Sequence, residues 1–201
     1  MKPFTTVRSL AIPLLRDNID TDAIIPSREM RTVSKDGLAD GLFANWRYAD
    51  VDGRIPDPAF ILNDPLYADA SILLGGANFG CGSSREHAAW ALAEYGIRVI
   101  VAKQFNPIFH GNCLRNGILP VALDAAPWAA MTGEMTVDLE SCTIKCGDTQ
   151  KDFAIAEEAR KMLLEGLDPI DLTLLDEALI TAFDARDRQR RGWAYLNQDE
   201  T

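Results

Sequence analysis

A glycine-rich segment at residues 79–88, with the sequence FGCGSSREHA, carries the side chains of this chain that are best suited to chemistry. Two glycines allow a ligand to approach the backbone closely, and two serine hydroxyls and an arginine follow them directly. If a helix begins there, its first N–H groups and its dipole also favour an anion. The segment therefore predicts a site for a small anion, made by Gly80, Cys81, Gly82, Ser83, Ser84 and Arg85.

The residues after the glycines also predict where a helix begins. Ser83 and Glu86 have the spacing of a capping box, and alanine and leucine then recur at helical intervals. We expect a helix over residues 84–95, ended by Gly96. Serine caps are common, so a purely structural role for Ser83, with Arg85 as a surface residue, fits the same pattern.

Other kinds of site fit the chain less well. A P-loop needs a lysine where this loop has a serine, and a dinucleotide fingerprint needs a third glycine that is missing. The two histidines and four cysteines do not have the spacing of metal ligands. We therefore expect no metal site in this chain and no iron–sulfur cluster held by it alone. Cys81 and His87 could form a nucleophile and its base, but six positions separate them and His87 is expected one turn into the helix. We therefore interpret His87 as a structural residue or as one that supports the site without touching the ligand.

The composition is that of an acidic globular protein. Thirty acidic and twenty basic residues give a net charge of −10, which disfavours nucleic acid and anionic membranes as partners. No apolar stretch reaches the length of a membrane span, and Arg8 and Pro13 interrupt the N-terminal run that would otherwise resemble a signal peptide. Four dispersed cysteines are typical of reduced thiols, so we expect a cytoplasmic protein.

Apolar strands and helices alternate in the middle of the chain, in the order expected of a mainly parallel α/β sheet. Three predicted strands and the two helices between them lie at residues 71–74, 84–95, 98–102, 107–116 and 118–123. Three further short segments predict a smaller antiparallel sheet, at residues 135–140, 143–146 and 151–155. Gly147 and Asp148 predict a hairpin turn between the last two.

The remaining segments are less regular. Short polar residues at 17–22 favour a turn, and prolines mark 50–69 as an irregular covering segment. A basic stretch at 27–36 is predicted to be a loop that faces solvent or a ligand. Helices are expected at residues 38–46, 156–165 and 177–186, with fraying of the tail from about residue 187.

Five motifs, in order along nearly the whole chain, resemble those of the small subunits of bacterial 3-isopropylmalate dehydratases, which are swivelling domains of the aconitase superfamily. The motifs are DNIDTDAIIP at 17–26, FANWRY at 43–48, GCGSSREHA at 80–88, FNPIFHGNCLRNGILPV at 105–121 and GLDPIDLTL at 166–174. The resemblance implies one α/β swivelling domain over residues 1–201. Its three β/β/α layers would contain a mainly parallel central sheet and a smaller antiparallel sheet.

The same resemblance implies that this chain is one half of a heteromeric hydro-lyase. Enzymes of this family interconvert 2-isopropylmalate and 3-isopropylmalate through isopropylmaleate in leucine biosynthesis. Their large subunit holds a four-iron, four-sulfur cluster, whose open iron acts on the substrate hydroxyl and a carboxylate. The partners expected for this chain are therefore a cluster-bearing large subunit and a small dicarboxylate substrate.

Roles for individual residues follow from the resemblance as well. Ser83 matches the family's catalytic base, and Ser84 and Arg85 match the groups that bind a substrate carboxylate. Asp22 matches an acidic active-site residue. From its sequence context alone, Asp22 is equally suited to forming an Asx turn.

A loop after Asp22 is expected to set the choice of substrate. Aconitase has a substrate arginine twelve positions after the matching aspartate, where this chain has Ser34. The loop instead offers apolar and cationic side chains suited to an isopropyl group and a carboxylate. These are Arg28, Met30, Arg31 and Val33.

Two other functions stay open at this point. The motifs around Ser83 also fit the small subunit of a related hydro-lyase that acts on citraconate, methylmalate or homoaconitate. Because this chain lacks cluster ligands, a non-catalytic anion-binding module is the second alternative. Activity after mixing with a cluster-bearing large subunit separates an enzyme subunit from such a module.

Overall fold

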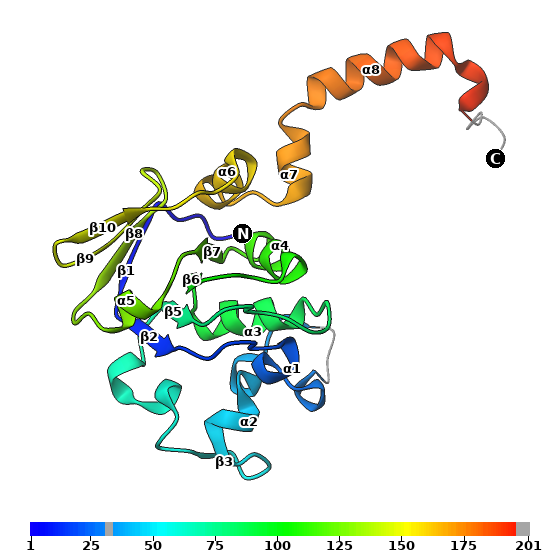
Figure 1. The fold of residues 1–201 in the computed structure, drawn as a ribbon. Coiled ribbons are helices and arrows are strands. Elements are labelled where there is room, and N and C mark those ends of the chain that lie inside the picture. The colour runs from blue at the N-terminus through cyan, green and yellow to red at the C-terminus, as the bar shows by residue number, and fades with distance from the viewer. Residues whose placement is uncertain (31–33, 196–201) are drawn as a thin grey trace.

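A four-stranded parallel sheet forms the centre of the fold (Figure 1). The computed structural model describes residues 1–30 and 34–195. The sheet has the order β2-β5-β6-β7, with strands Ala11–Leu14, Ile72–Gly75, Val99–Ala102 and Leu119–Ala122. β5 and β6 are buried along their whole length, which explains why their sequences are continuous apolar runs. The predicted parallel sheet is confirmed.

An antiparallel sheet lies beside it, in the order β1-β8-β9-β10. Its strands are Thr6–Ser9, Met135–Asp138, Thr143–Cys146 and Thr149–Asp152. The β9–β10 hairpin turns at Gly147 and Asp148 as predicted, although β10 begins two residues before the expected segment. β1 joins from the other end of the chain, a pairing that the sequence pattern does not predict. The second sheet is thus confirmed, and it equals the first in strand number.

The two sheets and a helical layer stack in the predicted β/β/α order. Side chains of the parallel strands alternate between the two faces of the sheet. Leu73 and Ile100 share a buried cluster with helices α3 (His87–Tyr95) and α4 (Pro107–Arg115). Leu74 and Val101 point the other way and share a second cluster with Val137 of the antiparallel sheet. Figure 1 shows the parallel strands between these two layers.

Short elements connect the strands and cover their ends; 3₁₀ turns are labelled η. Helix α1 (Thr21–Ile24) begins inside the predicted turn, because Asp20 Oδ1 accepts a hydrogen bond from Ala23 N at 2.6 Å and caps it. The helix predicted over 38–46 is split into η2 and α2. The other short elements are η1 (Ser27–Glu29), η2 (Ala39–Gly41), α2 (Ala44–Arg47), β3 (Tyr48–Asp50), β4 (Ile55–Pro56), η3 (Ile61–Asn63), η4 (Pro65–Tyr67) and α5 (Ala126–Ala129).

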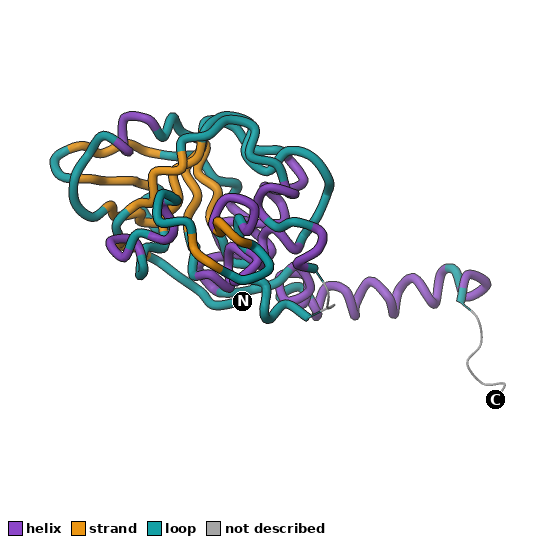
Figure 2. The backbone as a smooth tube through the Cα atoms, turned by 90° about the horizontal axis from the view of Figure 1, so that it is seen from below, coloured by secondary structure: helices purple, strands orange, loops and turns teal. Residues whose placement is uncertain are grey.

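A helical arm ends the described part of the chain. After α6 (Glu157–Glu165) and α7 (Pro169–Leu174), helix α8 (Glu177–Arg190) projects away from the body and leads to η5 (Gly192–Ala194) (Figures 1 and 2). α8 continues past the expected end at residue 186, so residues 187–190 are helical where the sequence predicts fraying. None of the described helices is long and apolar enough to cross a bilayer.

Candidate functional site

The glycine-rich segment leaves the carboxyl end of β5 and is fixed by the segments that follow β2 and β6. Gly80 N donates to Ile19 O at 2.7 Å, and Thr21 N donates to Cys81 O at 2.9 Å. On the other side, Asn106 N donates to Phe79 O at 2.9 Å. Ligands of open α/β sheets usually bind at the carboxyl ends of the parallel strands. The loop is therefore held at the edge of the sheet where a ligand is expected.

Gly80 is required by packing beneath the loop. Its φ of +73° lies in the left-handed region, and a Cβ at this position would lie 2.1 Å from Cγ of Phe109. The Phe109 ring is almost completely buried and packs against Phe79, with ring centroids 5.6 Å apart. The first glycine of the segment thus lets the loop lie directly on the aromatic core.

Gly80→Ala should destabilise the fold by about 3 kcal/mol or more, from backbone strain together with overpacking against Phe109. Urea unfolding followed by circular dichroism measures the change. Gly133→Ala is the matched control, because Gly133 has a φ of +99° but nothing lies within 4 Å of the place that a methyl group would occupy. The control should lose only the strain, about 1 kcal/mol. Equal losses in the two variants would mean that the Phe109 ring moves away without cost.

Ser83 and Ser84 lie on the surface of the loop with open hydroxyl groups. Both residues are exposed. The backbone of Ser83 is fixed, because its carbonyl oxygen accepts hydrogen bonds from Thr21 Oγ1 at 2.9 Å and from Arg85 N at 2.8 Å. Within residues 1–30 and 34–195, neither serine hydroxyl has a hydrogen-bond partner. The Oγ atom of Ser83 is therefore available to a docked ligand.

The helix behind the loop starts later than the sequence predicts. α3 begins at His87, and its N-cap Glu86 has a helical backbone and makes no capping bond, so the predicted capping box with Ser83 is wrong. Glu86 Oε1 instead accepts a hydrogen bond from Asn116 Nδ2 at 2.8 Å. The helix dipole acts mainly within the first turn. Ser83 precedes that turn by four residues, so the dipole contributes less there than the sequence predicts.

N–H groups of the loop itself, in place of the expected helix amides, are the candidate donors for an anion. The N–H group of Gly80 is already bonded to Ile19. Those of Gly82, Ser83 and Ser84 make no hydrogen bond to any residue that the structure describes. Successive free N–H groups in a loop can bind an anion without a helix.

Asp22 and Arg85 meet at this loop, although 63 residues separate them in the chain. Arg85 Nη1 donates to Asp22 Oδ1 in an ion pair between the loop and the first turn of α1. The Arg85 side chain is 27% exposed and that of Asp22 54% exposed. The pair uses one of the five N–H donors of the guanidinium, so others remain for a ligand. Asp22 is therefore placed to orient Arg85.

Two neighbouring aspartates, and not Asp22, accept the backbone hydrogen bonds that stabilise this turn. Asp20 Oδ1 caps α1, and Asp17 Oδ1 accepts a hydrogen bond from Ala77 N at 2.6 Å. Asp22 forms no such turn within the described chain, and its carboxylate pairs with Arg85. The structure therefore brings together Asp22, Ser83, Ser84 and Arg85.

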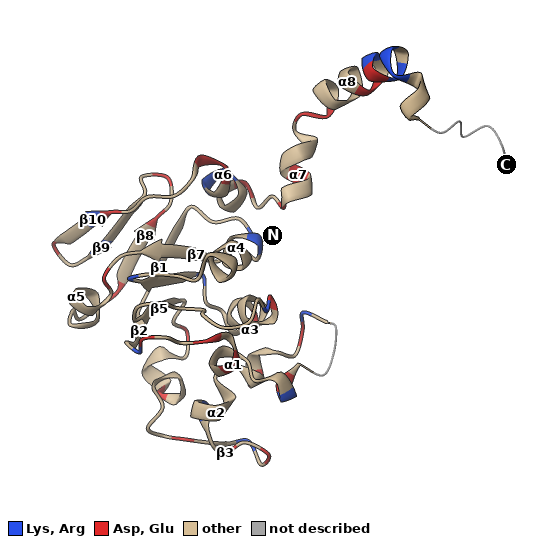
Figure 3. Ribbon diagram, turned by 45° about the vertical axis from the view of Figure 1, so that its right-hand side comes forward, with Lys and Arg blue, Asp and Glu red and all other residues tan. Residues whose placement is uncertain are grey.

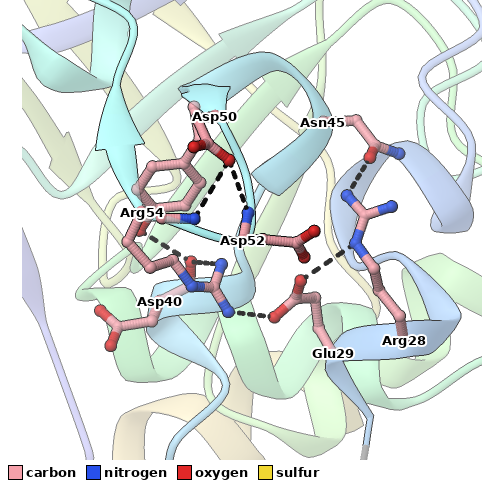
Figure 4. Close-up of polar contacts among 9 residues, drawn as sticks. Arg28, Glu29, Asp40, Asn45, Asp50, Asp52 and Arg54 are labelled. Atoms are coloured by element: carbon pink, nitrogen blue, oxygen red, sulfur yellow. Dashed lines mark hydrogen bonds and ion pairs between the residues drawn. The ribbon is translucent and has the colours of Figure 1, made fainter.

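The predicted specificity loop is only partly described, because Arg31 and Val33 lie outside the described residues. Met30 is half-buried and packs on the core that contains α1 and α3. Arg28 is bonded to Glu29 and Asn45, and Arg54 holds the same glutamate from the other side (Figure 4). Arg28 and Arg54 line a polar cavity of about 370 Å³. The described lining of this cavity does not include the glycine-rich segment.

Glu94 of α3 fixes the far end of this loop, a role that the sequence does not predict. Its carboxylate accepts hydrogen bonds from the N–H groups of Gly37, Leu38 and Ala39 at 2.6, 2.5 and 2.8 Å. Burial acts to raise the pKa of Glu94, but the three donors outweigh it and leave the pKa below its ordinary value. The loop is therefore anchored to the helix that follows the glycine segment.

Cysteine and histidine side chains offer little chemistry here. Among the described residues, no three His, Cys, Asp or Glu side chains form a group that could hold a metal ion. Cys113 is fully buried, and burial raises the pKa of its thiol, so the thiol stays protonated. His87 packs on Trp90 with ring centroids 4.6 Å apart. The described residues therefore do not fit an iron–sulfur cluster held by this chain.

Known proteins resemble this chain over nearly its whole length. The profile of the aconitase C-terminal domain matches residues 1–126. The 3-isopropylmalate dehydratase small subunit of Cupriavidus necator is 55% identical, with 98% of this chain and 100% of that protein covered. The small subunit of the same name from Shewanella sp. strain W3-18-1 is 47% identical, with 96% and 99% covered.

A solved structure has the same fold. The crystal structure of 3-isopropylmalate dehydratase from Methanocaldococcus jannaschii matches with a TM-score of 0.65 and 25% identity, covering 89% of this chain and 99% of that one. Sequence identities of 55% and 47% over nearly the whole chain, together with the domain match, indicate a common family and not only a common fold. This chain therefore belongs to the aconitase C-terminal domain family, among the small subunits of 3-isopropylmalate dehydratases.

Proposed function

We propose that this chain is the small subunit of a 3-isopropylmalate dehydratase, a hydro-lyase that interconverts 2-isopropylmalate and 3-isopropylmalate in leucine biosynthesis. The observation that carries the proposal is the open Ser83 hydroxyl on a fixed loop that also presents the ion pair of Arg85 and Asp22. The reaction requires a base for a C–H proton and a cation for a carboxylate. This loop offers candidates for both.

In the proposed dehydration, Ser83 Oγ takes the proton from the carbon next to the hydroxyl-bearing carbon. The C–H electrons form the double bond of isopropylmaleate, and hydroxide leaves the neighbouring carbon. Adding water with the opposite orientation yields the other isomer and returns the proton from Ser83. A serine acts as a base only where its alkoxide is stabilised. The free loop N–H groups and the Arg85 charge would provide that stabilisation with little reorganisation.

The departing hydroxyl needs an acid, which we assign to the large subunit. The aconitase relationship supports a four-iron, four-sulfur cluster there, which would supply a Lewis acid for the hydroxyl and one carboxylate. In this division of labour, the present chain provides Ser83 Oγ as the base. It binds a carboxylate through Arg85, Ser84 Oγ and the free N–H groups of the loop from Gly82 to Ser84.

Charge also supports a site completed by a second chain. The substrate is a dianion, whereas this protein has a net charge of −10 and its loop presents one arginine already paired with Asp22. A single shared cation is a weak partner for two carboxylates. The second carboxylate would therefore be bound by the large subunit.

We further propose a cytoplasmic protein that consists of one swivelling domain, with no nucleic acid or membrane partner. The four cysteines are free in the structure, as is typical of a reducing compartment. One continuous apolar cluster fills the space between the parallel and the antiparallel sheet. This shared core favours a single folding unit over residues 1–165.

Reconstitution with the large subunit tests the proposed function. Each chain alone should be inactive. The mixture should hydrate isopropylmaleate and isomerise 2-isopropylmalate, and its kcat/KM should be higher for these substrates than for the others in a substrate panel. The panel includes citraconate, 2-methylmalate and homoaconitate. A preference for one of these would assign the chain to a related hydro-lyase, and an inactive mixture that still binds isopropylmalate would favour a non-catalytic module.

Replacing Met30 and Val33 together by Gln and Thr should raise the KM for 2-isopropylmalate about tenfold, because an isopropyl group loses apolar contacts. The KM for a hydroxy-diacid that lacks the isopropyl group serves as the control and should change much less. Thermal melting checks that the loss of Met30 packing does not unfold the loop. An unchanged KM for isopropylmalate would remove this loop from substrate selection.

A further inference from the structure

The helical arm carries apolar side chains that the described chain leaves exposed. They occur in both α7 and α8 and in the turn between them, at Ile170, Leu174, Leu175, Leu179, Ile180 and Phe183. The principal neighbour of α8 is η5, which continues from its own end, and Figure 1 shows α8 extending away from both sheets. Exposed apolar residues that gather on one element mark an interaction surface more often than single ones do.

The apolar residues of α8 gather on one side of the helix. Leu179 and Phe183 are one turn apart and lie within one stripe, and Ile180 borders it. Their exposed fractions are 70%, 53% and 45%. A lone helix of 14 residues is only marginally stable in water without tertiary packing. A partner that covers this stripe would supply that packing.

The end of α8 adds a charge signature to the apolar stripe. Residues 184–191, DARDRQRR, contain four arginines and two aspartates in a protein whose overall charge is −10. Figure 3 shows this cationic group at the far end of the arm. Two of the arginines pair with aspartates one turn earlier, so positive charge is left over. A complementary partner surface would be apolar, with an acidic border at the end of α8.

The arm lies outside the family's common domain but is retained among the small subunits. The aconitase C-terminal domain profile ends at residue 126. The alignments to the Cupriavidus and Shewanella small subunits cover 98% and 96% of this chain, so both must include most of α8. Those relatives are named as small subunits, and the name itself implies a larger partner chain.

From these observations we propose that the arm formed by α7 and α8 is a docking element for the large subunit. Leu179 and Phe183 would enter an apolar groove of the large subunit, and the arginines at residues 186–191 would face acidic residues at its border. This inference rests on the proposed function for the identity of the partner. It goes further by assigning the contact to a segment remote from the glycine-rich loop.

Direct binding of purified subunits tests the proposal. The dissociation constant is measured by titrating fluorescently labelled small subunit with its cognate large subunit, without substrate. Leu179→Asp combined with Phe183→Asp should raise it about 100-fold, as expected for two central apolar contacts. Thr181→Asp combined with Ala185→Asp is the matched control, because it adds the same charge on the other side of α8 and should change the constant less than threefold.

Each outcome has a definite meaning. A large loss in the first variant and none in the control supports the docking role, provided that circular dichroism shows equal helix content. Equal affinity of the first variant and the wild-type chain overturns the docking role but leaves the proposed function standing. If the first variant binds the large subunit normally but no longer self-associates in sedimentation velocity, the docking role is overturned. The arm would then be a contact between copies of this chain. If wild-type chains do not bind at all, the proposed function fails together with the docking role.

Discussion

Replacing Ser83 by alanine should lower the kcat of the reconstituted enzyme about 1,000-fold, which is typical of losing a general base. KM should change little, because the loop amides and Arg85 still bind the carboxylate. Stability should stay within about 0.5 kcal/mol of wild type, since the hydroxyl is exposed and does not cap α3. Steady-state kinetics on isopropylmaleate and thermal melting measure both effects.

Two further serine variants make this result specific. Ser84→Ala should act mainly on KM, as expected of a carboxylate-binding hydroxyl. Ser141→Ala is the remote control, because Ser141 is an exposed serine beside β9 and should leave both constants unchanged. If Ser83→Ala retains more than about a tenth of wild-type kcat, the base is another group. If it fails to bind the large subunit, the loop has a structural role instead.

The central architecture follows from local patterns in the sequence. β5 and β6 are continuous apolar runs, and a glycine follows the first while charged residues flank the second. Between these strands in the chain, α3 has small apolar residues at helical spacing. These features predict a parallel unit without knowledge of the tertiary structure. The pairing of β1 with β8 is different, because about 130 residues separate the strands and no local signal links them.

Short elements are predicted less well because single hydrogen bonds decide them. α1 has only four residues and depends on the Asp20 cap, in a sequence that equally favours a turn. α7 has a capping box formed by Asp168 and Asp171, with aspartate where the common pattern has glutamate. The start of α3 shows the opposite error. Ser83 and Glu86 have capping-box spacing, but neither side chain caps the helix, and the Glu86 carboxylate accepts a hydrogen bond from Asn116 instead.

The glycine segment is contiguous, so the sequence already groups Ser83, Ser84 and Arg85. The resemblance to the aconitase superfamily adds Asp22, whose ion pair with Arg85 then appears in the structure. Thr21 and Glu94 could not be identified in this way. Each acts on backbone groups of a distant segment, and such contacts depend on the folded chain rather than on residue spacing.

Arg85→Lys should raise the KM for 2-isopropylmalate about 30-fold, with a smaller change in kcat. A charged hydrogen bond to a carboxylate contributes roughly 1.5–3 kcal/mol, and lysine lacks the planar fork that allows bidentate binding. Arg8→Lys is the matched control, because Arg8 forms an exposed ion pair with Glu134 on the antiparallel sheet. An unchanged KM in Arg85→Lys would place the carboxylate site elsewhere.

Asp22→Asn tests whether Asp22 only positions Arg85 or acts on the substrate itself. The Asp22 side chain is more than half exposed, so solvent screens the ion pair and the melting temperature should hardly change. If Asp22 acts only by orienting Arg85, Asp22→Asn should raise KM in the wild-type background, yet add almost nothing in the Arg85→Lys background. Additive effects, or a fall in kcat with unchanged KM, would mean that Asp22 acts on the substrate itself. The double-mutant cycle therefore decides whether this aspartate is a catalytic residue or a positioning residue for the arginine.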